Sequence, residues 1–106
     1  MIVVTTEEVA GQRVVEALGL VRGSTVRAAH VGRDVRAWFK NVVGGEVEEY
    51  TKLLAESREQ ALDRMVAEAR AKGADAVVGL RFASSEIASG CSELLAYGTA
   101  VKLARS

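Results

Sequence analysis

The hydrophobic and polar positions of the sequence are most regular from Val47 to Lys72, where apolar residues recur three or four positions apart. This spacing is typical of an amphipathic α-helix that buries one stripe of its surface. The expected stripe consists of Val47, Tyr50, Leu54, Ala61, Leu62, Met65, Val66 and Ala69. Gly73 follows at the position where helices commonly end, because only glycine adopts a left-handed backbone there at little cost. The sequence therefore predicts one long helix with a sharp C-terminal stop.

An alternating stretch follows this stop and predicts a strand from Ala76 to Phe82. Its well-buried face is expected to hold Ala76, Val78, Leu80 and Phe82, and its second face Val77, Gly79 and Arg81. The tripeptide Ala88-Ser89-Gly90 is typical of a hairpin turn. A last strand over 94–103 is therefore expected to pair with the preceding one.

The last strand separates its residues into two different faces. One face holds Leu95, Tyr97, Thr99, Val101 and Leu103, and the other Leu94, Ala96, Gly98, Ala100 and Lys102. The second face is small rather than charged, and one layer of helix covers only one side of a sheet. We therefore expect a contact with a second subunit, formed by Val77, Gly79, Ala96, Gly98 and Ala100. The alternative is that a helix over 31–43 crosses to this side.

The N-terminal half is rich in β-formers. Met1 to Thr6 predicts a short strand, and the stretch from Arg13 to Ala29 predicts either one bent strand or two strands with a turn at 22–24. Gly19 and Gly23 interrupt this stretch, and glycine within a strand marks a bulge or a close backbone approach. A second, shorter helix is then predicted by an apolar stripe of Val31, Val35, Trp38, Phe39 and Val42.

These elements give the order β-β-α-α-β-β in a single domain over 1–106. The predicted class is α+β, with two layers: a mainly antiparallel sheet of about four strands, packed on one long helix and a shorter one.

The composition excludes several classes of protein. The chain has 106 residues, and its 14 basic and 14 acidic side chains cancel, so no global field draws it onto nucleic acid or an anionic membrane. The short basic stripe of Arg33, Arg36 and Lys40 is a weak nucleic-acid footprint. The first residues show no basic region followed by an apolar core, so we expect no signal peptide, and no run approaches the roughly 20 apolar residues of a membrane span. The one cysteine allows no internal disulfide, and we expect a cytoplasmic protein.

Metal-ligating residues are scarce. The soft ligands are Cys91 and His30, about sixty positions apart, and Glu93 could add an oxygen near the hairpin. A structural zinc site needs four ligands, so a single chain cannot build one. Cys91, His30 and Glu93 would form a site for a divalent heavy metal only if subunits brought them together. No other cofactor is expected.

Catalytic patterns are also missing from the sequence. It has no G-x-S-x-G motif, and no nucleophile has an evident base beside it. Its neighbouring carboxylates lie on the predicted outer face of the long helix, where solvation explains them. The sequence therefore predicts a protein that is not an enzyme.

A series of segments in fixed order adds a resemblance to these patterns. The segments are Val15–Gly23, Gly32–Asp34, Val43–Glu46 with Tyr50, Ala61-Leu62 with Met65, Gly73–Gly79 and Ala96–Val101. Together they resemble the YbjQ-like family of small bacterial proteins over nearly the whole chain. The resemblance implies a two-layer fold related to dodecin subunits and assembly as a homopentamer. The family carries the label "putative heavy-metal-binding", and the resemblance implies no set of catalytic residues.

The combined interpretation is a non-catalytic, cytoplasmic homopentamer that binds a ligand, an ion or a protein partner. The alternative is a heavy-metal-binding protein whose sites are built at subunit contacts. A small enzyme with a site between subunits comes third.

Overall fold

A computed structural model describes residues 1–28, 48–88 and 91–105. The elements are β1 (Ile2–Val3), β2 (Gln12–Ala28), α2 (Glu48–Ala71), β3 (Ala76–Ala88) and β4 (Cys91–Arg105). They form one four-stranded sheet in the order β1-β3-β4-β2, in which β1 is parallel to β3 and the other pairs are antiparallel. The α+β class and the mainly antiparallel sheet are thus confirmed. The predicted helix over 31–43 lies outside the described residues.

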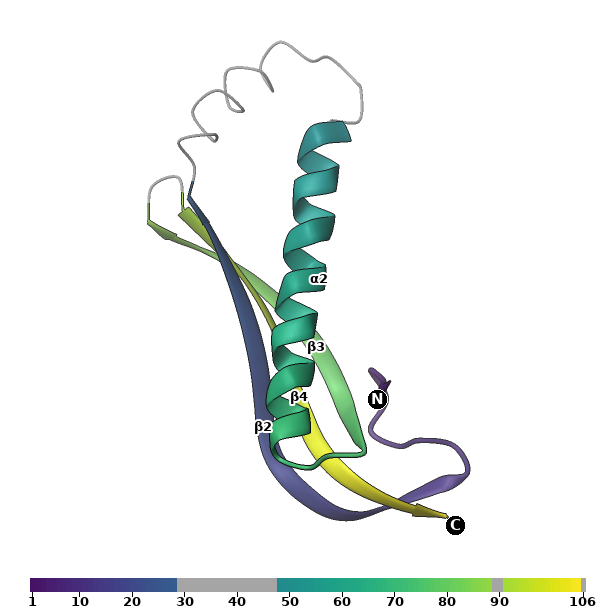
Figure 1. Ribbon diagram of the computed structural model, residues 1–106. Coiled ribbons are helices and arrows are strands. Elements are labelled where there is room, and N and C mark those ends of the chain that lie inside the picture. Colours follow the sequence, from purple (N-terminus) through teal and green to yellow (C-terminus); the bar gives the residue numbers. More distant parts are fainter. Residues whose placement is uncertain (29–47, 89–90, 106) are drawn as a thin grey trace.

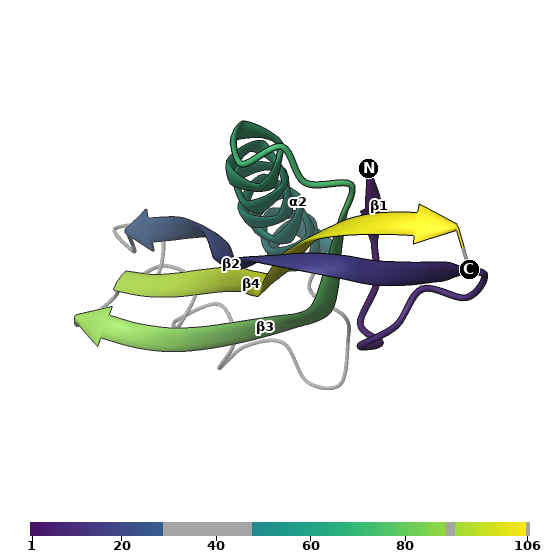
Figure 2. The ribbon, with the colours of Figure 1, turned by 90° about the horizontal axis from the view of Figure 1, so that it is seen from below.

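The helix α2 lies along one face of the sheet (Figures 1 and 2). It ends as predicted, because Gly73 has a φ of 76° and the amides of Gly73 and Ala74 donate to the carbonyl oxygens of Arg70 and Ala69 at 2.9 and 3.0 Å. These two bonds satisfy carbonyl groups that the end of the helix would otherwise leave unpaired. The sharp stop lets the chain enter β3 within a few residues.

The stretch from Gln12 to Ala28 is one continuous strand, which decides between the two alternatives left by the sequence. Its register against β4 shifts between Val14 and Glu16 and again between Ala17 and Gly19, so the strand bends through two bulges. Gly19 has a φ of 107°, whereas Gly23 is the point of close approach to α2. β2 therefore contains both a glycine at a bulge, Gly19, and a glycine at a close backbone approach, Gly23.

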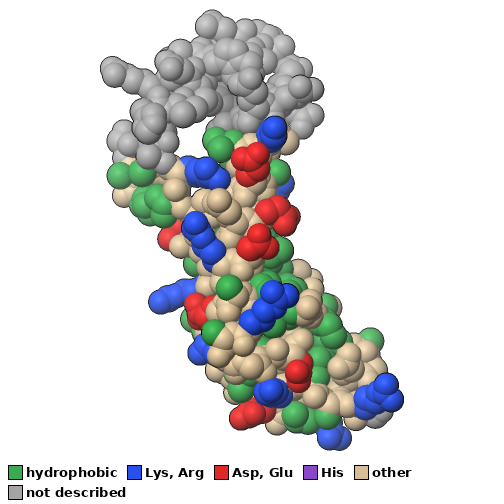
Figure 3. Space-filling model, in the orientation of Figure 1, with side chains coloured by type: hydrophobic (Ala, Val, Ile, Leu, Met, Phe, Trp, Pro, Cys, Tyr) green, Lys and Arg blue, Asp and Glu red, His purple; other side chains and the backbone are tan. Residues whose placement is uncertain are grey.

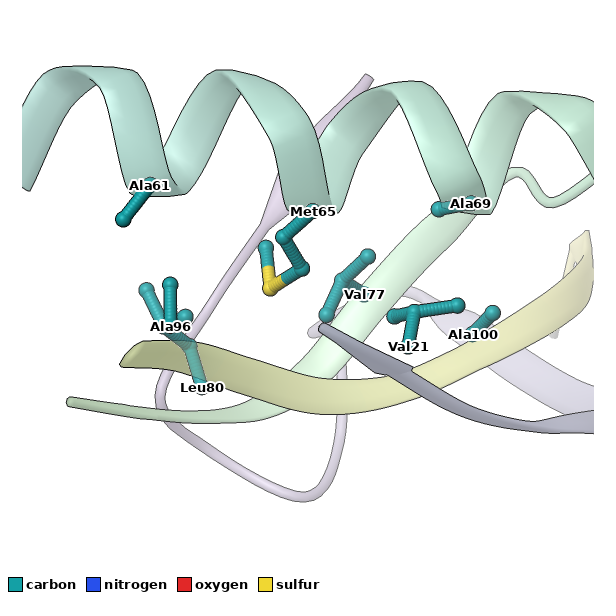
Figure 4. Packing of buried hydrophobic residues seen from close by; sticks show 8 residues of the cluster. All are labelled: Val21, Ala61, Met65, Ala69, Val77, Leu80, Ala96 and Ala100. Carbon is teal, nitrogen blue, oxygen red and sulfur yellow. The ribbon is translucent and has the colours of Figure 1, made fainter. Parts of the chain in front are cut away.

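The core lies between α2 and the sheet. Figure 4 shows its buried cluster, which consists of Val21, Ala61, Met65, Ala69, Val77, Leu80, Ala96 and Ala100. The helix contributes mostly small side chains, so its backbone approaches the strands closely and Met65 fills the space that remains. The prediction of the helix stripe is confirmed for Ala61, Met65 and Ala69, while Leu62 and Val66 are partly buried.

The predicted burial of Leu54 is wrong, since its side chain is 44% exposed. The helix and the strands spread apart toward the N-terminal end of α2, and Leu54 belongs to this half of the helix (Figure 1). Buried Ser57 makes the contact instead: its carbonyl oxygen accepts from Thr25 Oγ1 at 3.1 Å and its Oγ accepts from Arg27 Nε at 3.0 Å. Polar bonds thus replace hydrophobic packing in this turn.

The predicted faces of β3 are partly wrong, because the alternation breaks at Gly79. The register of β3 against β4 shifts between Val78 and Arg81, and Gly79 has a φ of 65°. Val77 and Leu80 therefore both point into the core beneath the helix, while Val78 belongs to a cluster on the other face. Phe82 lies beyond the covered part and is exposed.

Candidate functional site

The sheet has a second face, opposite α2, on which no helix of the described residues lies, and which we call the helix-free face. Directly paired residues of antiparallel strands share a face, so the register places on it Leu20, Arg22, Val26, Arg81, Ala83, Ser85, Glu93, Leu95, Tyr97, Thr99 and Val101. Val78 and Val101 belong to a buried cluster on this face, which fixes its orientation. The helix-free face has a covered part and an open part.

The N-terminal segment covers one part of the helix-free face. Val4 and Val9 pack there on the cluster of Ala76, Val78 and Val101. Backbone bonds hold the segment against the outer edge of β3, since the amides of Gly79 and Leu80 donate to the carbonyl oxygens of Thr6 and Val4 at 2.8 and 3.0 Å. Arg81 adds a side-chain bond from Nη1 to the carbonyl oxygen of Thr5 at 2.9 Å. This cover is therefore anchored at several points.

A groove of about 850 Å³ is lined by Glu7 and Glu8 of this segment and by residues of the sheet beside it. Its floor contains Val78, Thr99 and Val101, and its rim carries Glu7, Glu8, Arg13 and Arg81. The floor is apolar apart from the Thr99 hydroxyl, while the rim presents both signs of charge. The groove therefore has room for a small molecule but shows no preference for an anion or a cation.

The open part of the helix-free face exposes large apolar side chains. On this face Leu20 is 58% exposed and Val26 51%; near the end of β3, at the irregularity between Glu86 and Ala88, Ile87 is 54% exposed. Every residue of β3 from Arg81 to Ala88 is exposed, although the strand continues through this stretch. We call this section of β3, with its partner section Cys91–Leu95 of β4, the arm. Apolar residues exposed together in this way are typical of a surface that meets another protein.

The opposite side of the molecule has a different character. Figure 3 shows acidic and basic side chains mixed along α2, with no large area of one sign. Such a surface is typical of a solvated helix. Apart from Leu54 of α2, the large exposed apolar side chains of the helix and the strands therefore lie on strands.

Two of the predicted metal ligands can be placed. Cys91 and Glu93 lie two positions apart on β4, on the same face of the arm, and both are partly buried. His30 lies outside the described residues. In 1–28, 48–88 and 91–105, no three His, Cys, Asp or Glu side chains gather into a possible metal site. Cys91 and Glu93 thus share a face of the arm, and no third ligand joins them among the described residues.

The residues predicted at a subunit contact lie inside the chain's own core. Val77, Ala96 and Ala100 are fully buried beneath α2, and Gly98 is buried beside Val77. The small face of β4 is small because the helix lies directly on it, which corrects the inference that a second subunit covers it. Gly79 lies instead at the bulge of β3, where it lines the groove.

The exposure of Leu20, Val26 and Ile87 is not among the predictions made from the sequence. The sequence pattern that could have indicated it is a difference in side-chain size. The face with the small residues Ala96 and Ala100 lies against α2, so the opposite face, with larger side chains, is the one that α2 does not cover. The two bulges of β2 hide this signal by breaking its alternation. No helix in the described ranges is long and apolar enough to cross a membrane.

Several known proteins are similar to this chain over nearly its whole length. A "UPF0145 protein" of Archaeoglobus fulgidus is 56% identical over 97% of this chain and 95% of its own length. The protein PBPRB0184 of Photobacterium profundum, also named UPF0145, is 53% identical over 97% of this chain and its whole length. A crystal structure of a protein of unknown function from Pediococcus pentosaceus, of the DUF74 family, has a TM-score of 0.64 at 14% identity and covers 98% of both chains.

The crystal structure shows similarity of fold alone, because its sequence identity is low. The names of the two relatives state no activity. A family model described as "Putative heavy-metal-binding" matches residues 1–104. The chain therefore belongs to the YbjQ family, whose members include the UPF0145 proteins.

Proposed function

We propose that the protein is a non-catalytic, cytoplasmic homo-oligomer, a homopentamer, which binds a ligand, an ion or a protein partner where its subunits meet. The observation that carries this proposal is the exposure of Leu20 and Val26 on the helix-free face and of Ile87 near the end of β3. Burying such side chains stabilises an assembly by roughly 25 cal/mol for each Å² of apolar surface removed from water. The chain offers this surface on a face that its helix does not cover.

The position of the groove supports a binding role near such a contact. Its lining residues Thr99 and Val101 continue along β4 from the open part of the helix-free face. Subunits that cover the open part would lie beside the groove and complete its walls. Binding sites commonly occur where surfaces meet in this way.

Light scattering on purified protein, in the absence of added metal, tests the assembly. The parent chain is expected to have the mass of an oligomer, and Leu20→Glu is expected to lower it because the contact would bury an unpaired charge. Leu54→Glu is the matched control, since it places the same charge at an exposed leucine of α2. A parent protein with the mass of a single chain contradicts the proposal.

A second candidate is heavy-metal binding at contacts between subunits. It is favoured by the placement of Cys91 and Glu93 on one face of the arm and by the description of the family. Soft divalent metals prefer thiolate ligands, and a contact between arms would multiply the two ligands of each chain. Calorimetric titration with zinc and with copper is expected to show binding by the parent and its loss in Cys91→Ser. Equal binding by both proteins excludes the cysteine as a ligand.

A further inference from the structure

We propose that the outer edge of β3 in the arm, from Phe82 to Ala88, pairs through its backbone with the outer edge of β2 in a second copy of the chain. This inference rests on the proposed homo-oligomer and specifies its contact. The contact would extend the sheet from one subunit into the next.

The edge of β3 is covered over its first half only. There, β1 pairs with Ala76 and Val77, and the N-terminal segment accepts hydrogen bonds from the amides of Gly79 and Leu80. The cover ends at Leu80. From there to Ala88, β3 pairs with β4 on its inner side, and no strand of the described part of the chain pairs with its outer side.

The direction of the Leu80 amide shows which groups face outward. This amide donates outward to the carbonyl oxygen of Val4, and backbone groups of a strand alternate in direction from one residue to the next. Phe82 and Ser84 therefore present their N–H and C=O groups at the open edge, while Arg81, Ala83 and Ser85 pair inward with β4. An exposed row of such groups is a template for another strand.

The sequence of this edge carries little of the protection that natural edge strands have. Lysine and proline are the usual protecting residues, and neither occurs from Phe82 to Ala88, where Glu86 is the one charged side chain. Arg81 is the charged residue that precedes the edge, but its guanidinium bonds the carbonyl oxygens of Thr5 and Leu80. The edge is thus suited to pairing.

The second open edge of the same sheet belongs to β2. On β4, the backbone groups of Leu95 and Tyr97 point toward β3, so those of Ala96 and Gly98 point toward β2. Val21 and Gly23 are paired with Gly98 and Ala96, and their backbone groups therefore point inward to β4. Leu20, Arg22 and Ser24 therefore face outward. The carbonyl oxygen of Ser24 accepts a hydrogen bond from Arg64 Nη1 at 2.6 Å, so the helix occupies this edge at Ser24. Before Ser24, no side chain of the described residues makes a comparable hydrogen bond to the outer edge of β2.

Pairing of β3 with the β2 of a second copy explains both edges at once. Such a contact is head-to-tail, and repetition about an axis closes a ring in which every subunit uses each edge once. Pairing of β3 with a second β3 would close a dimer and leave both β2 edges open. Because open edges promote uncontrolled association, we infer the head-to-tail contact.

Proline substitutions test this contact, since proline removes one N–H group and is tolerated where that group faces away from the sheet. Ser84→Pro and Arg22→Pro each remove an outward donor, and Ser84→Ala and Arg22→Ala are controls that keep it. Light scattering is expected to show the parent mass in both alanine variants and the mass of a single chain in both proline variants. Circular dichroism at the parent level is expected to show that the proline variants are folded.

If a folded Ser84→Pro protein has the same mass in solution as the parent, the inferred contact is wrong, while the proposal of a homo-oligomer still stands. Loss of assembly in Ser84→Pro but not in Arg22→Pro overturns the choice of β2. A monomeric parent overturns the proposed function itself. Hydrogen exchange gives a test that needs no variant: the Phe82 and Ser84 amides are expected to be protected in the assembled parent, and rapid exchange at both contradicts the contact.

Discussion

Gly23 of β2 lies directly beneath Met65 of α2. A Cβ atom built on Gly23 would overlap the backbone nitrogen of Met65 and the carbonyl oxygen of Ala61, and would lie 2.7 Å from the Cβ of Arg64. Main-chain atoms of a packed helix cannot yield as the end of a flexible side chain does. The helix therefore rests on this strand at a position where β2 has no side chain to hold it away.

Gly23→Ala is expected to lower the free energy of unfolding by about 1–3 kcal/mol, because the added methyl group must displace the helix. Urea denaturation followed by circular dichroism measures the change. Without a clash, replacing a strand glycine by alanine would stabilise the protein instead, so the sign of the change is informative. A Gly23→Ala variant as stable as the parent would mean that the helix does not approach the strand at this point.

Met65 and Leu54 differ in burial although both were expected in the same stripe. Met65 is fully buried and Leu54 is 44% exposed. Met65→Ala is therefore expected to cost about 2–5 kcal/mol of unfolding free energy, and Leu54→Ala no more than about 0.5 kcal/mol. Urea denaturation of both variants gives the comparison. Equal losses would show that the N-terminal half of α2 packs on apolar surface after all.

The sequence predicts the long helix and its stop well, because both depend on local chemistry. The stripe around Met65 follows the helical period, and Gly73 has the left-handed backbone that its position requires. Leu54 fits the same period but lies where the sheet no longer faces the helix. Periodicity indicates which side of a helix is apolar, and it cannot indicate where the opposing layer ends.

The faces of the strands could not be predicted to the same extent. A bulge changes the face of every residue that follows it, and the bulges at Gly19 and Gly79 are visible in the sequence only as isolated glycines. The small side chains of Ala96 and Ala100 were interpreted as a subunit contact. They are small because a helix of the same chain covers them closely. Size alone does not identify the partner of a tightly packed face.

The candidate surface was the least predictable feature. It depends on which face the helix covers, and this follows from the register of three strands. Cys91 and Glu93 share a face because their spacing is that of a strand. The exposure of Leu20 and Ile87, by contrast, follows from tertiary structure alone.

The bulge at Gly79 gives a last prediction, because it controls which β3 side chains enter the core. Gly79 has a φ of 65°, and no atom lies within 4 Å of a Cβ built on it, so a substitution there tests backbone strain without a steric clash. Gly79→Ala is expected to lower the free energy of unfolding by about 1–2 kcal/mol, which is the cost of a left-handed backbone in an L-residue. Gly79→Asn is expected to lose less, since asparagine adopts this conformation more readily. Thermal and urea denaturation of the two variants measure the difference, and an alanine variant as stable as the parent would show that β3 passes this point without the bulge, with Leu80 turned away from Met65.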